Sequence, residues 1–236
     1  MQIISHRGAA GLEPENTIRS LKKAISLNVD KIEIDVHLSK DGKLVVMHDR
    51  SVDRTTNGNG NIKDLESDYI KKLYVQNNFD LESKDLKVPF LSEVFDIIKG
   101  VDITLLIEVK NPKIYPGIDL KLLDLIEKYN VESQVEIFSF DNKFVENLKN
   151  SRPDLFVGQF KISPFNSGKL DNVNAVGIYY HSLLIRKSYL EELHKKNIKV
   201  YVWSVNSQSA MQKMIDLKVD GIITDRPDVL KTTMGY

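Results

Sequence analysis

Two carboxylates separated by a single residue are the first sign of chemistry in the sequence. Glu33 and Asp35 alternate with isoleucine and valine in the segment Lys31–Val36. Side chains two apart in a β-strand point to the same side, so the two acids share one face, with Cα atoms roughly 6.5 Å apart. One interpretation is the wet face of an antiparallel sheet. The other is a partly buried pair of acids, which requires compensation because burial penalises charge.

A third acid repeats this pattern in the next predicted parallel strand. Glu108 and Lys110 alternate with apolar residues in the segment Leu105–Pro112. Carboxylates on adjacent strands offer the oxygen ligands that Ca²⁺ and Mg²⁺ prefer. The pattern therefore predicts one site for a divalent cation, Ca²⁺ or Mg²⁺, at Glu33, Asp35 and Glu108, with Lys110 beside it to hold an anionic ligand. A network of internal salt bridges is the alternative.

Two of the five histidines fall where they could transfer protons. His6 ends the first predicted strand, and His48 ends a chain segment that returns beside the second, so both are predicted at one rim. The unperturbed pKa of imidazole, about 6.5, suits general acid–base catalysis near neutrality. Arg7 follows directly, and a guanidinium fork can bind a phosphate through two hydrogen bonds. A cation, an arginine, a lysine and two imidazoles together indicate phosphoryl transfer.

The other three histidines carry weaker signals. His37 follows the second strand and is expected to be a solvated loop histidine. His194 lies in a charged helical segment and is expected to face solvent. His181 closes a predicted strand, where a loop role and a pocket role are both open.

The composition limits the classes of function. The chain has 236 residues, 42% of them hydrophobic, with 33 basic and 33 acidic residues and no cysteine. The balanced charge argues against a nucleic-acid binder, and neither a polybasic membrane patch nor a disulfide framework is evident. Met1–Gly8 does not resemble a signal peptide, and no apolar run approaches the ~18 residues of a membrane span. A cytoplasmic enzyme is the expectation.

Short apolar runs alternate with helical patterns along most of the chain, which indicates a mostly parallel sheet. Helical periodicity is found in 17–27, 92–99, 119–129, 142–150, 188–196 and 207–217. The predicted strands are Gln2–Ser5, Lys31–Val36, Leu44–Met47, Ile103–Val109, Val135–Phe140, Leu155–Phe160, Ala175–Tyr180, Lys199–Val205 and Gly221–Thr224.

One of these strands cannot belong to the parallel set. Only seven residues separate Val36 from Leu44, whereas a parallel crossover needs a dozen or more. Asp41-Gly42 is a hairpin signal, so Leu44–Met47 should return antiparallel. Eight β/α units remain, which predicts one α/β domain over 1–236 folded as a (β/α)8 TIM barrel. A doubly wound open sheet is the competing topology.

The segment 50–87 breaks the β/α rhythm. It is polar and rich in Asn, Asp and Lys. We interpret it as a small insertion after the second strand, lying over the barrel mouth, with a short helix at Asp68–Leu73. The alternative is a long loop without a role, although long loops in compact domains are often functional.

The ordered motifs along the chain resemble the glycerophosphodiester phosphodiesterase family. They are His6-Arg-Gly8, Pro14-Glu-Asn-Thr17, Glu33-Ile-Asp35, Lys40-Asp-Gly42, Val45-Val-Met-His-Asp49, Val52-Asp-Arg-Thr-Thr56, Ile107-Glu-Val-Lys110, Val202-Trp-Ser-Val-Asn206 and Gly221-Ile-Ile-Thr-Asp-Arg-Pro227. Each motif alone is weak, but the ordered set is specific and spans essentially the whole chain.

The resemblance implies a phosphatidylinositol-phospholipase-like TIM barrel that hydrolyses glycerophosphodiesters to glycerol 3-phosphate and an alcohol. It also implies a divalent cation, commonly Ca²⁺ or Mg²⁺. The family's metal-ligand positions fall on Glu33, Asp35 and Glu108. Its catalytic histidines fall on His6 and His48, and its phosphate-contacting cations on Arg7 and Lys110. We further expect Trp203, at the same rim, to line the glycerol side of a substrate pocket.

Three other functions are weighed against this one. A phosphodiesterase acting on lipids, of the lysophospholipase D or sphingomyelinase D kind, would favour apolar or basic rims at the mouth, and none is obvious in the sequence. A glycosidase using Glu33 and Glu108 would leave Arg7, Lys110 and the paired histidines unexplained. A non-catalytic barrel would be expected to lack one of these residues. The alcohol, the metal and the oligomeric state, a homodimer included, stay open.

Overall fold

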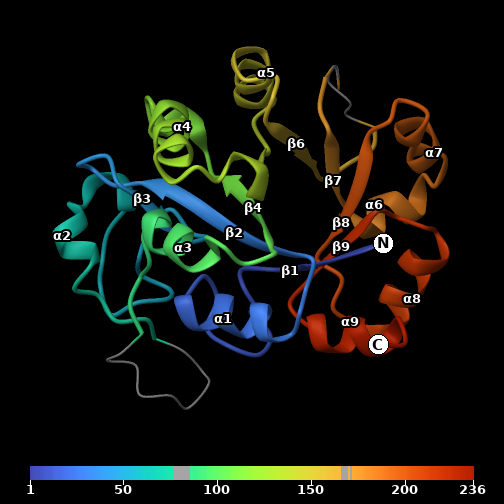
Figure 1. Cartoon of the computed structure of the whole chain (residues 1–236), viewed down its shortest axis with the longest axis horizontal. Helices are drawn as coiled ribbons and strands as arrows, with labels where there is room; N and C mark the ends of the chain where they lie inside the picture. Colours follow the sequence, from blue (N-terminus) through green and yellow to red (C-terminus); the bar gives the residue numbers. More distant parts are fainter. Residues whose placement is uncertain (77–85, 166–169, 171) are drawn as a thin grey trace.

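Eight parallel strands form a closed barrel in the computed structural model (Figure 1). The structure describes residues 1–76, 86–165, 170 and 172–236. The barrel order is β1-β9-β8-β7-β6-β5-β4-β2, and pairing of β1 with β2 closes it. This closure confirms the predicted TIM barrel and excludes the open doubly wound sheet. The barrel strands are β1 Gln2–Ser5, β2 Lys31–Leu38, β4 Thr104–Val109, β5 Val135–Ser139, β6 Phe156–Lys161, β7 Ala175–Tyr179, β8 Lys199–Trp203 and β9 Gly221–Thr224.

Helices connect the strands along the outside of the barrel (Figure 1). The predicted helical segments agree with the structure to within about three residues at each end, and among the described helices only α6 and α9 were not predicted. The helices are α1 Ile18–Ser26, α2 Ser67–Ile70, α3 Leu91–Ile98, α4 Ile118–Tyr129, α5 Asn142–Ser151, α6 Tyr180–Ile185, α7 Ser188–His194, α8 Gln208–Asp216 and α9 Pro227–Thr233, with 3₁₀ turns η1 Ile62–Asp64, η3 Pro112–Ile114 and η4 Glu132–Gln134. None of the helices in the described ranges combines the length and apolarity needed to cross a bilayer.

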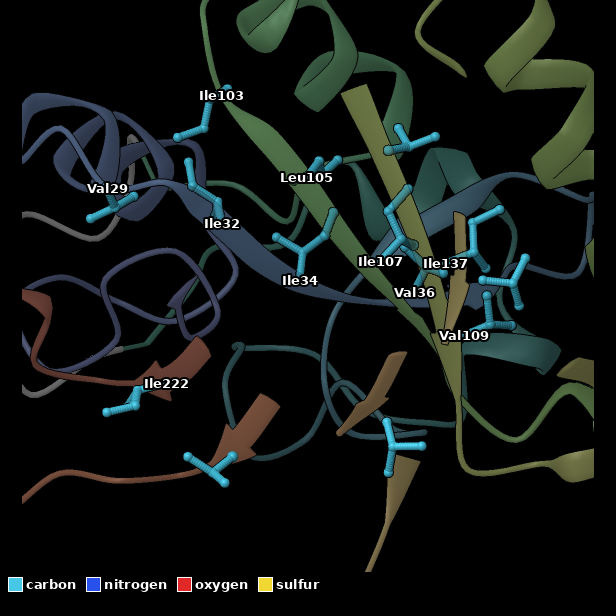
Figure 2. Close-up of a cluster of buried hydrophobic side chains, with 14 of the residues drawn as sticks. Val29, Ile32, Ile34, Val36, Ile103, Leu105, Ile107, Val109, Ile137 and Ile222 are labelled. Atoms are coloured by element: carbon cyan, nitrogen blue, oxygen red, sulfur yellow. The ribbon is translucent and has the colours of Figure 1, made fainter. Parts of the chain in front are cut away.

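Alternate residues of β2 face two different environments, the surrounding helices and the barrel interior. Ile32, Ile34 and Val36 are fully buried in the large apolar cluster between the barrel and its helices. Figure 2 shows these side chains with Ile107 and Val109 of β4 in the same cluster. Because neighbouring residues of a strand point to opposite faces, the residues between them are directed into the barrel. Burying the apolar face therefore fixes which residues face the interior.

Aromatic rings fill the middle of the barrel. Phe138 of β5 lies 5.0 Å from Phe160 of β6 and 5.9 Å from Tyr201 of β8, measured between ring centroids. Two glycines make room for these rings. A Cβ atom at Gly158 would lie 2.2 Å from the ring of Phe138, and one at Gly177 would lie 2.2 Å from the ring of Phe160. The interior is thus a packed core and not a channel.

A hairpin follows β2 as predicted. Strand β3, Leu44–Val46, pairs antiparallel with β2 and aligns Val36 with Val46. Gly42 occupies the turn with φ of 78°, a conformation that glycine adopts without steric cost. Because the strand returns along β2, it brings His48 back towards the rim of the barrel.

The described part of the segment 50–87 forms a small apolar core of its own against the hairpin. The short helix predicted at Asp68–Leu73 is α2, Ser67–Ile70. Residues 77–85 of the predicted insertion lie outside the described residues. The position over the mouth and the single domain over 1–236 remain predictions. The core consists of Val45, Met47, Val52, Ile62, Ile70, Leu73, Val75, Leu86 and Val88.

A buried ion pair marks the opposite, N-terminal end of the barrel. Lys31 Nζ pairs with Glu136 Oε1 and donates a hydrogen bond of 2.8 Å to the Tyr201 hydroxyl. Removing one partner of such a pair leaves an uncompensated buried charge, whereas replacing both with apolar residues avoids this penalty. We therefore expect Glu136→Met to lower the free energy of unfolding by about 3–5 kcal/mol.

The matched control is the double variant Lys31→Met/Glu136→Met. It is expected to unfold at a urea concentration at least as high as that of the unsubstituted chain. If the double variant were no more stable than Glu136→Met, the charge argument would be wrong and lost packing would explain the effect.

Candidate active site

Three carboxylates meet at the C-terminal end of the barrel interior. Glu33 and Asp35 come from β2 and Glu108 from β4, and the strand register pairs Asp35 directly with Glu108. All three residues are buried, and each offers an oxygen atom within 4.8 Å of those of the other two. The structure thus brings together the three residues predicted to hold a cation.

The loop after β1 holds the carboxylates from one side. The Arg7 backbone N–H donates to Glu33 Oε2 at 2.8 Å. Asn16 donates through Nδ2 to Asp35 Oδ2 at 2.8 Å and accepts from the Asp35 backbone N–H at 3.3 Å. Arg7 and Asn16 both have positive φ, 49° and 55°. Residues other than glycine rarely adopt this conformation. Here it occurs at the two loop residues that donate hydrogen bonds to Glu33 and Asp35.

The three carboxyl groups differ in their affinity for protons. Burial, together with the neighbouring acids, raises the pKa of Glu33 well above its usual range. The same causes raise the pKa of Glu108 to about 7. Burial opposes the charge of Asp35 as well, but Lys110 and Arg7 outweigh it and lower its pKa to about 2.

These carboxyl groups fit a hard divalent cation. The donors are all oxygen atoms, as Ca²⁺ and Mg²⁺ prefer. Asp35 Oδ1 is buried and accepts no hydrogen bond in the described structure. A cation among the three carboxylates would supply the compensation that Glu33 and Glu108 otherwise obtain by holding protons.

Two cationic side chains border the carboxylates. Lys110 Nζ lies 2.8 Å from Glu108 Oε1 and 3.4 Å from Asp35 Oδ1. Arg7 Nε lies 3.6 Å from Asp35 Oδ2, and its Nη1 donates to Glu15 at 3.0 Å. Burial opposes both positive charges, but the acids outweigh it and raise both pKa values. Both groups are therefore cationic at neutral pH.

The segment after the hairpin contacts the site through a second arginine, Arg54, which binds the same glutamate as Arg7. Arg54 donates to both oxygens of Glu15, at 3.0 and 2.7 Å, and through Nε to Asp49 at 2.5 Å. Glu15 therefore links Arg54 to Arg7. Glu15 and Asn16, which precede α1 in the motif Pro14-Glu-Asn-Thr17, both contact site residues.

His6 and His48 flank the carboxylates, and each has one ring nitrogen bound to an aspartate. His6 Nδ1 lies 2.6 Å from Asp225 Oδ1, while its Nε2 lies 3.9 Å from Glu33. His48 Nδ1 lies 2.7 Å from Asp49 Oδ1. A carboxylate on Nδ1 favours the tautomer with a proton there, which leaves Nε2 of each ring for other partners.

His37 contradicts the expectation of a solvated loop histidine. Its side chain lies in β2 and is fully buried. Because Nε2 lies 3.0 Å from the carbonyl oxygen of His48, it must carry the proton, and Nδ1 then accepts from the Tyr115 hydroxyl at 2.9 Å. Burial lowers the pKa of His37 to about 4, so the ring is neutral at pH 7. This burial could not be predicted from local pattern, because Tyr115 lies 78 residues from His37.

A cavity of about 180 Å³ opens over the carboxylates. Its polar wall consists of the imidazoles, acids and cations, and its apolar wall includes Phe140, Phe160 and Trp203. The Trp203 indole N–H is buried and has no hydrogen-bond partner in the described structure. No described residue of the segment 50–87 lines this cavity. The other predicted site residues that line it are His6, Arg7, Glu33, His48, Glu108 and Lys110.

Two larger hollows, of about 520 and 620 Å³, lie elsewhere on the described surface. One is lined by residues such as Gln2 and Lys218 at the N-terminal end of the barrel, and the other by residues such as Lys71 and Lys121. Neither is lined by a histidine or by the acid cluster. Chemistry, and not volume, therefore identifies the candidate active site.

The aspartates that hold the two histidines were not predicted from the sequence. Asp225 follows β9, and it also accepts a hydrogen bond of 2.5 Å from Asn206, which follows β8. Both residues stand inside recognised motifs, but Asp225 is 219 residues from His6. Only the closure of the barrel between β1 and β9 reveals the pair. Asp49 directly follows His48 in the sequence, and this adjacency could have indicated their contact.

Comparisons with known proteins agree with this geometry. A model of the glycerophosphoryl diester phosphodiesterase family matches residues 6–229. A glycerophosphodiester phosphodiesterase from Caldanaerobacter subterraneus subsp. tengcongensis is 38% identical, over 97% of this chain and 95% of the relative. A human lysophospholipase D is 28% identical, over 97% of this chain and 84% of that protein.

The fold is also that of solved phosphodiesterases. A phosphodiesterase from Oleispira antarctica, solved in complex with the product sn-glycerol-3-phosphate, superposes with a TM-score of 0.91 at 23% identity, over 100% of this chain and 97% of that one. The fold is thus a TIM barrel. The chain belongs to the glycerophosphoryl diester phosphodiesterase family, and the predictions of this family and of an enzyme are confirmed.

The acid cluster generates a test of cation binding. We expect Ca²⁺ or Mg²⁺ to bind to one site per chain in a calorimetric titration. Asp35→Asn should weaken binding by more than about tenfold, because loss of even a residue that supports a metal ligand often costs 10–100-fold. Glu66→Gln is the control, since Glu66 is exposed and pairs only with Lys40 among the described ion pairs. Equal affinities for Asp35→Asn and the control would contradict the assignment.

Proposed function

We propose that the chain hydrolyses glycerophosphodiesters to sn-glycerol 3-phosphate and an alcohol, with one divalent cation at Glu33, Asp35 and Glu108. The observation that carries this proposal is that two cations, two aspartate-bound imidazoles and the acids Glu33 and Glu108 line one cavity. Asp35 lies in the same acid cluster. Such a set can stabilise a charged phosphoryl group and also transfer protons. The substrate class rests on the family and on the bacterial relative that is 38% identical.

The acids and cations would act together on the phosphate. The bound cation would neutralise charge on the phosphate oxygens and polarise the phosphorus centre. Arg7 and Lys110 are placed beside the same carboxylates, so their donors can take the remaining phosphate oxygens. Arg7 Nε supports this role because it is buried and has no hydrogen-bond partner in the described structure.

The two histidines would supply the acid and the base. One Nε2 atom takes a proton from the nucleophile as a new P–O bond forms. The other gives a proton to the alcohol oxygen as its bond to phosphorus breaks. Asp225 and Asp49 favour a proton on Nδ1 of each ring, which leaves Nε2 as the atom that exchanges the proton. The nucleophile is water or a neighbouring glycerol hydroxyl, the latter through a cyclic phosphate, and incorporation of ¹⁸O from labelled water distinguishes the two routes.

The apolar wall favours a second candidate substrate. Phe140, Phe160 and Trp203 can contact the glycerol carbon atoms, and the free Trp203 N–H can donate to a glycerol hydroxyl. The same surface also suits a diester that carries an acyl chain, as in lysophospholipase D-like or sphingomyelinase D-like activity. The human relative that is 28% identical is a lysophospholipase D, and the sphingomyelinase D-like reaction stays a prediction from the sequence.

The central test measures glycerol 3-phosphate release from glycerophosphocholine, glycerophosphoethanolamine and glycerophosphoglycerol. We expect activity that EDTA abolishes and that Ca²⁺ or Mg²⁺ restores. His6→Ala and His48→Ala should each lower kcat by ~10²–10⁴, the usual contribution of a general acid or base. Near-normal turnover in both variants would overturn the assignment of these histidines.

His37 yields a separate test of positioning. His37→Ala removes the donor to the His48 carbonyl, and we expect kcat to fall by ~10–100-fold with little change in KM, because small displacements of a catalytic group are costly. His37→Gln keeps a donor at a similar reach and should recover most of the loss. Equal losses in both variants, with equally lowered melting temperatures, would indicate a purely structural role.

A further inference from the structure

The guanidinium of Arg54 lies between two parts of the active site. Through Nε it donates to Asp49 Oδ2 at 2.5 Å, and through Nη1 and Nη2 it donates to Glu15 at 3.0 and 2.7 Å. Arg54 itself does not line the cavity over the carboxylates. Any influence of this arginine on the reaction must therefore pass through the two carboxylates that it binds.

Each of these carboxylates holds a different functional group. Asp49 binds Nδ1 of His48 through its other oxygen, at 2.7 Å. Glu15 accepts a hydrogen bond of 3.0 Å from Nη1 of Arg7. His48 and Arg7 both line the cavity, one as a predicted proton-transfer group and the other as a predicted phosphate contact. Arg54 thus completes a chain of contacts in which each acid lies between two nitrogen donors: His48, Asp49, Arg54, Glu15 and Arg7.

An ordinary surface ion pair is the alternative interpretation, since the Arg54 side chain is 49% exposed. Exposed pairs contribute little because both side chains lose entropy and water screens their charges. The contacts of Arg54 differ from such a pair in two respects. The two bonds to Glu15 form a fork that a planar guanidinium provides, and the same group also binds Asp49. A lysine ammonium, as a single point charge, could not reproduce both contacts.

Packing fixes the backbone on both sides of Arg54. Val52 is fully buried in the small apolar core of the segment after the hairpin, and Thr56 is also buried. The hydroxyl and the backbone N–H of Thr56 both donate to the Val52 carbonyl, at 2.7 and 3.1 Å. Because the chain is held on either side of Arg54, the guanidinium extends from a rigid base. The small core therefore determines where the bridge between the two carboxylates lies.

Arg54 also helps to keep both carboxylates ionised. Burial opposes the charge of Asp49, but hydrogen bonds from Arg54 and His48 outweigh it and lower its pKa to about 2. Burial likewise opposes the charge of Glu15, but Arg54 and Arg7 outweigh it and lower its pKa. An ionised Asp49 favours a proton on Nδ1 of His48, and an ionised Glu15 is the stronger hydrogen-bond acceptor for Arg7.

We infer that Arg54 is a positioning residue that couples the proton-transfer side of the site to the phosphate-binding side. This inference rests on the proposed phosphodiesterase function and adds to it a role for the segment after the hairpin. Through Asp49, Arg54 holds the tautomer and orientation of the His48 ring. Through Glu15, it holds the guanidinium of Arg7 beside the carboxylates. Loss of Arg54 should therefore impair proton transfer and phosphate binding together, whereas loss of either acid should impair mainly one of them.

A second arginine provides a matched control. Arg152 likewise donates three hydrogen bonds to two carboxylates, at 3.0 and 2.8 Å to Asp154 and at 2.7 Å to Glu127. It lies shortly before β6, at the N-terminal end of the barrel, and does not line the cavity. Arg54→Gln and Arg152→Gln therefore remove the same kind of ion-pair network, and only the first network lies at the site. An effect that came from lost surface ion pairs alone would be shared by both variants.

The first test is kinetic, with glycerophosphocholine as substrate. We expect Arg54→Gln to lower kcat by ~10–100-fold, because small displacements of a catalytic group are costly, and to raise KM by about fivefold, a common size for coupling between contacting residues. Arg152→Gln should change neither parameter. Asp49→Asn should lower mainly kcat, and Glu15→Gln should raise mainly KM.

Double variants show whether Arg54 acts through these acids. Arg54→Gln added to Asp49→Asn should lower kcat little further, and added to Glu15→Gln it should raise KM little further, because the linking carboxylate is already neutral. Losses that simply add in both double variants, or equal losses in Arg54→Gln and Arg152→Gln, would contradict the coupling.

The second test examines the histidine without substrate. At about pH 8, above the unperturbed pKa of imidazole, ¹⁵N chemical shifts of the ring nitrogens report the tautomer, and the signals of His48 are identified by their loss in His48→Ala. We expect the Nδ1-protonated form in the unsubstituted chain and in Arg152→Gln, and a mixture of tautomers in Arg54→Gln. Unchanged His48 signals in Arg54→Gln would overturn the inference.

The two measurements distinguish a failure of the coupling from a failure of the proposed function. The ring signals need no turnover, so they decide whether Arg54 positions His48 independently of any activity. If the unsubstituted chain releases glycerol 3-phosphate but the His48 signals are the same in Arg54→Gln, the inference is wrong while the proposed function stands. If no glycerophosphodiester is cleaved, the proposed function fails, and the catalytic role of Arg54 fails with it.

Discussion

The repulsion among three buried carboxylates is the constraint around which the rest of the site is arranged. Glu33, Asp35 and Glu108 cannot all be ionised in a buried space without positive charge nearby. Lys110 and Arg7 compensate Asp35, whereas Glu33 and Glu108 have raised pKa values. The protein alone therefore accommodates the cluster only because Glu33 and Glu108 tend to hold protons. A cation among the three carboxylates would allow all three to ionise.

Rigid elements hold this unfavourable arrangement in place. Glu33 and Asp35 share β2 with a row of buried isoleucine and valine, so they cannot turn away without exposing that apolar face. Glu108 is held in the same way by β4. The loop after β1 adds direct hydrogen bonds to Glu33 and Asp35. Hydrophobic packing on the outer side of the barrel thus stabilises an electrostatic arrangement on its inner side.

The sequence predicted the features that depend on local pattern. Alternation in β2 and β4 placed the acids on the inner face, and the Asp41-Gly42 turn identified the hairpin that returns His48. What it could not predict depends on pairs of residues far apart in the chain. The Asp225 carboxylate meets His6, and the Tyr115 hydroxyl meets His37, only when the chain folds. His37 shows this most clearly, because alternation alone could not distinguish a solvated position from a fully buried one.

The bond between His6 and Asp225 has a consequence for how the fold assembles. The two residues lie 219 positions apart, and β9, which completes the barrel, ends directly before Asp225. The aspartate can therefore reach the imidazole only once β1 and β9 have paired, so the orientation of His6 depends on completion of the barrel. A polypeptide cut before β9 would retain Glu33, Asp35 and Glu108 but would lack the carboxylate that orients His6.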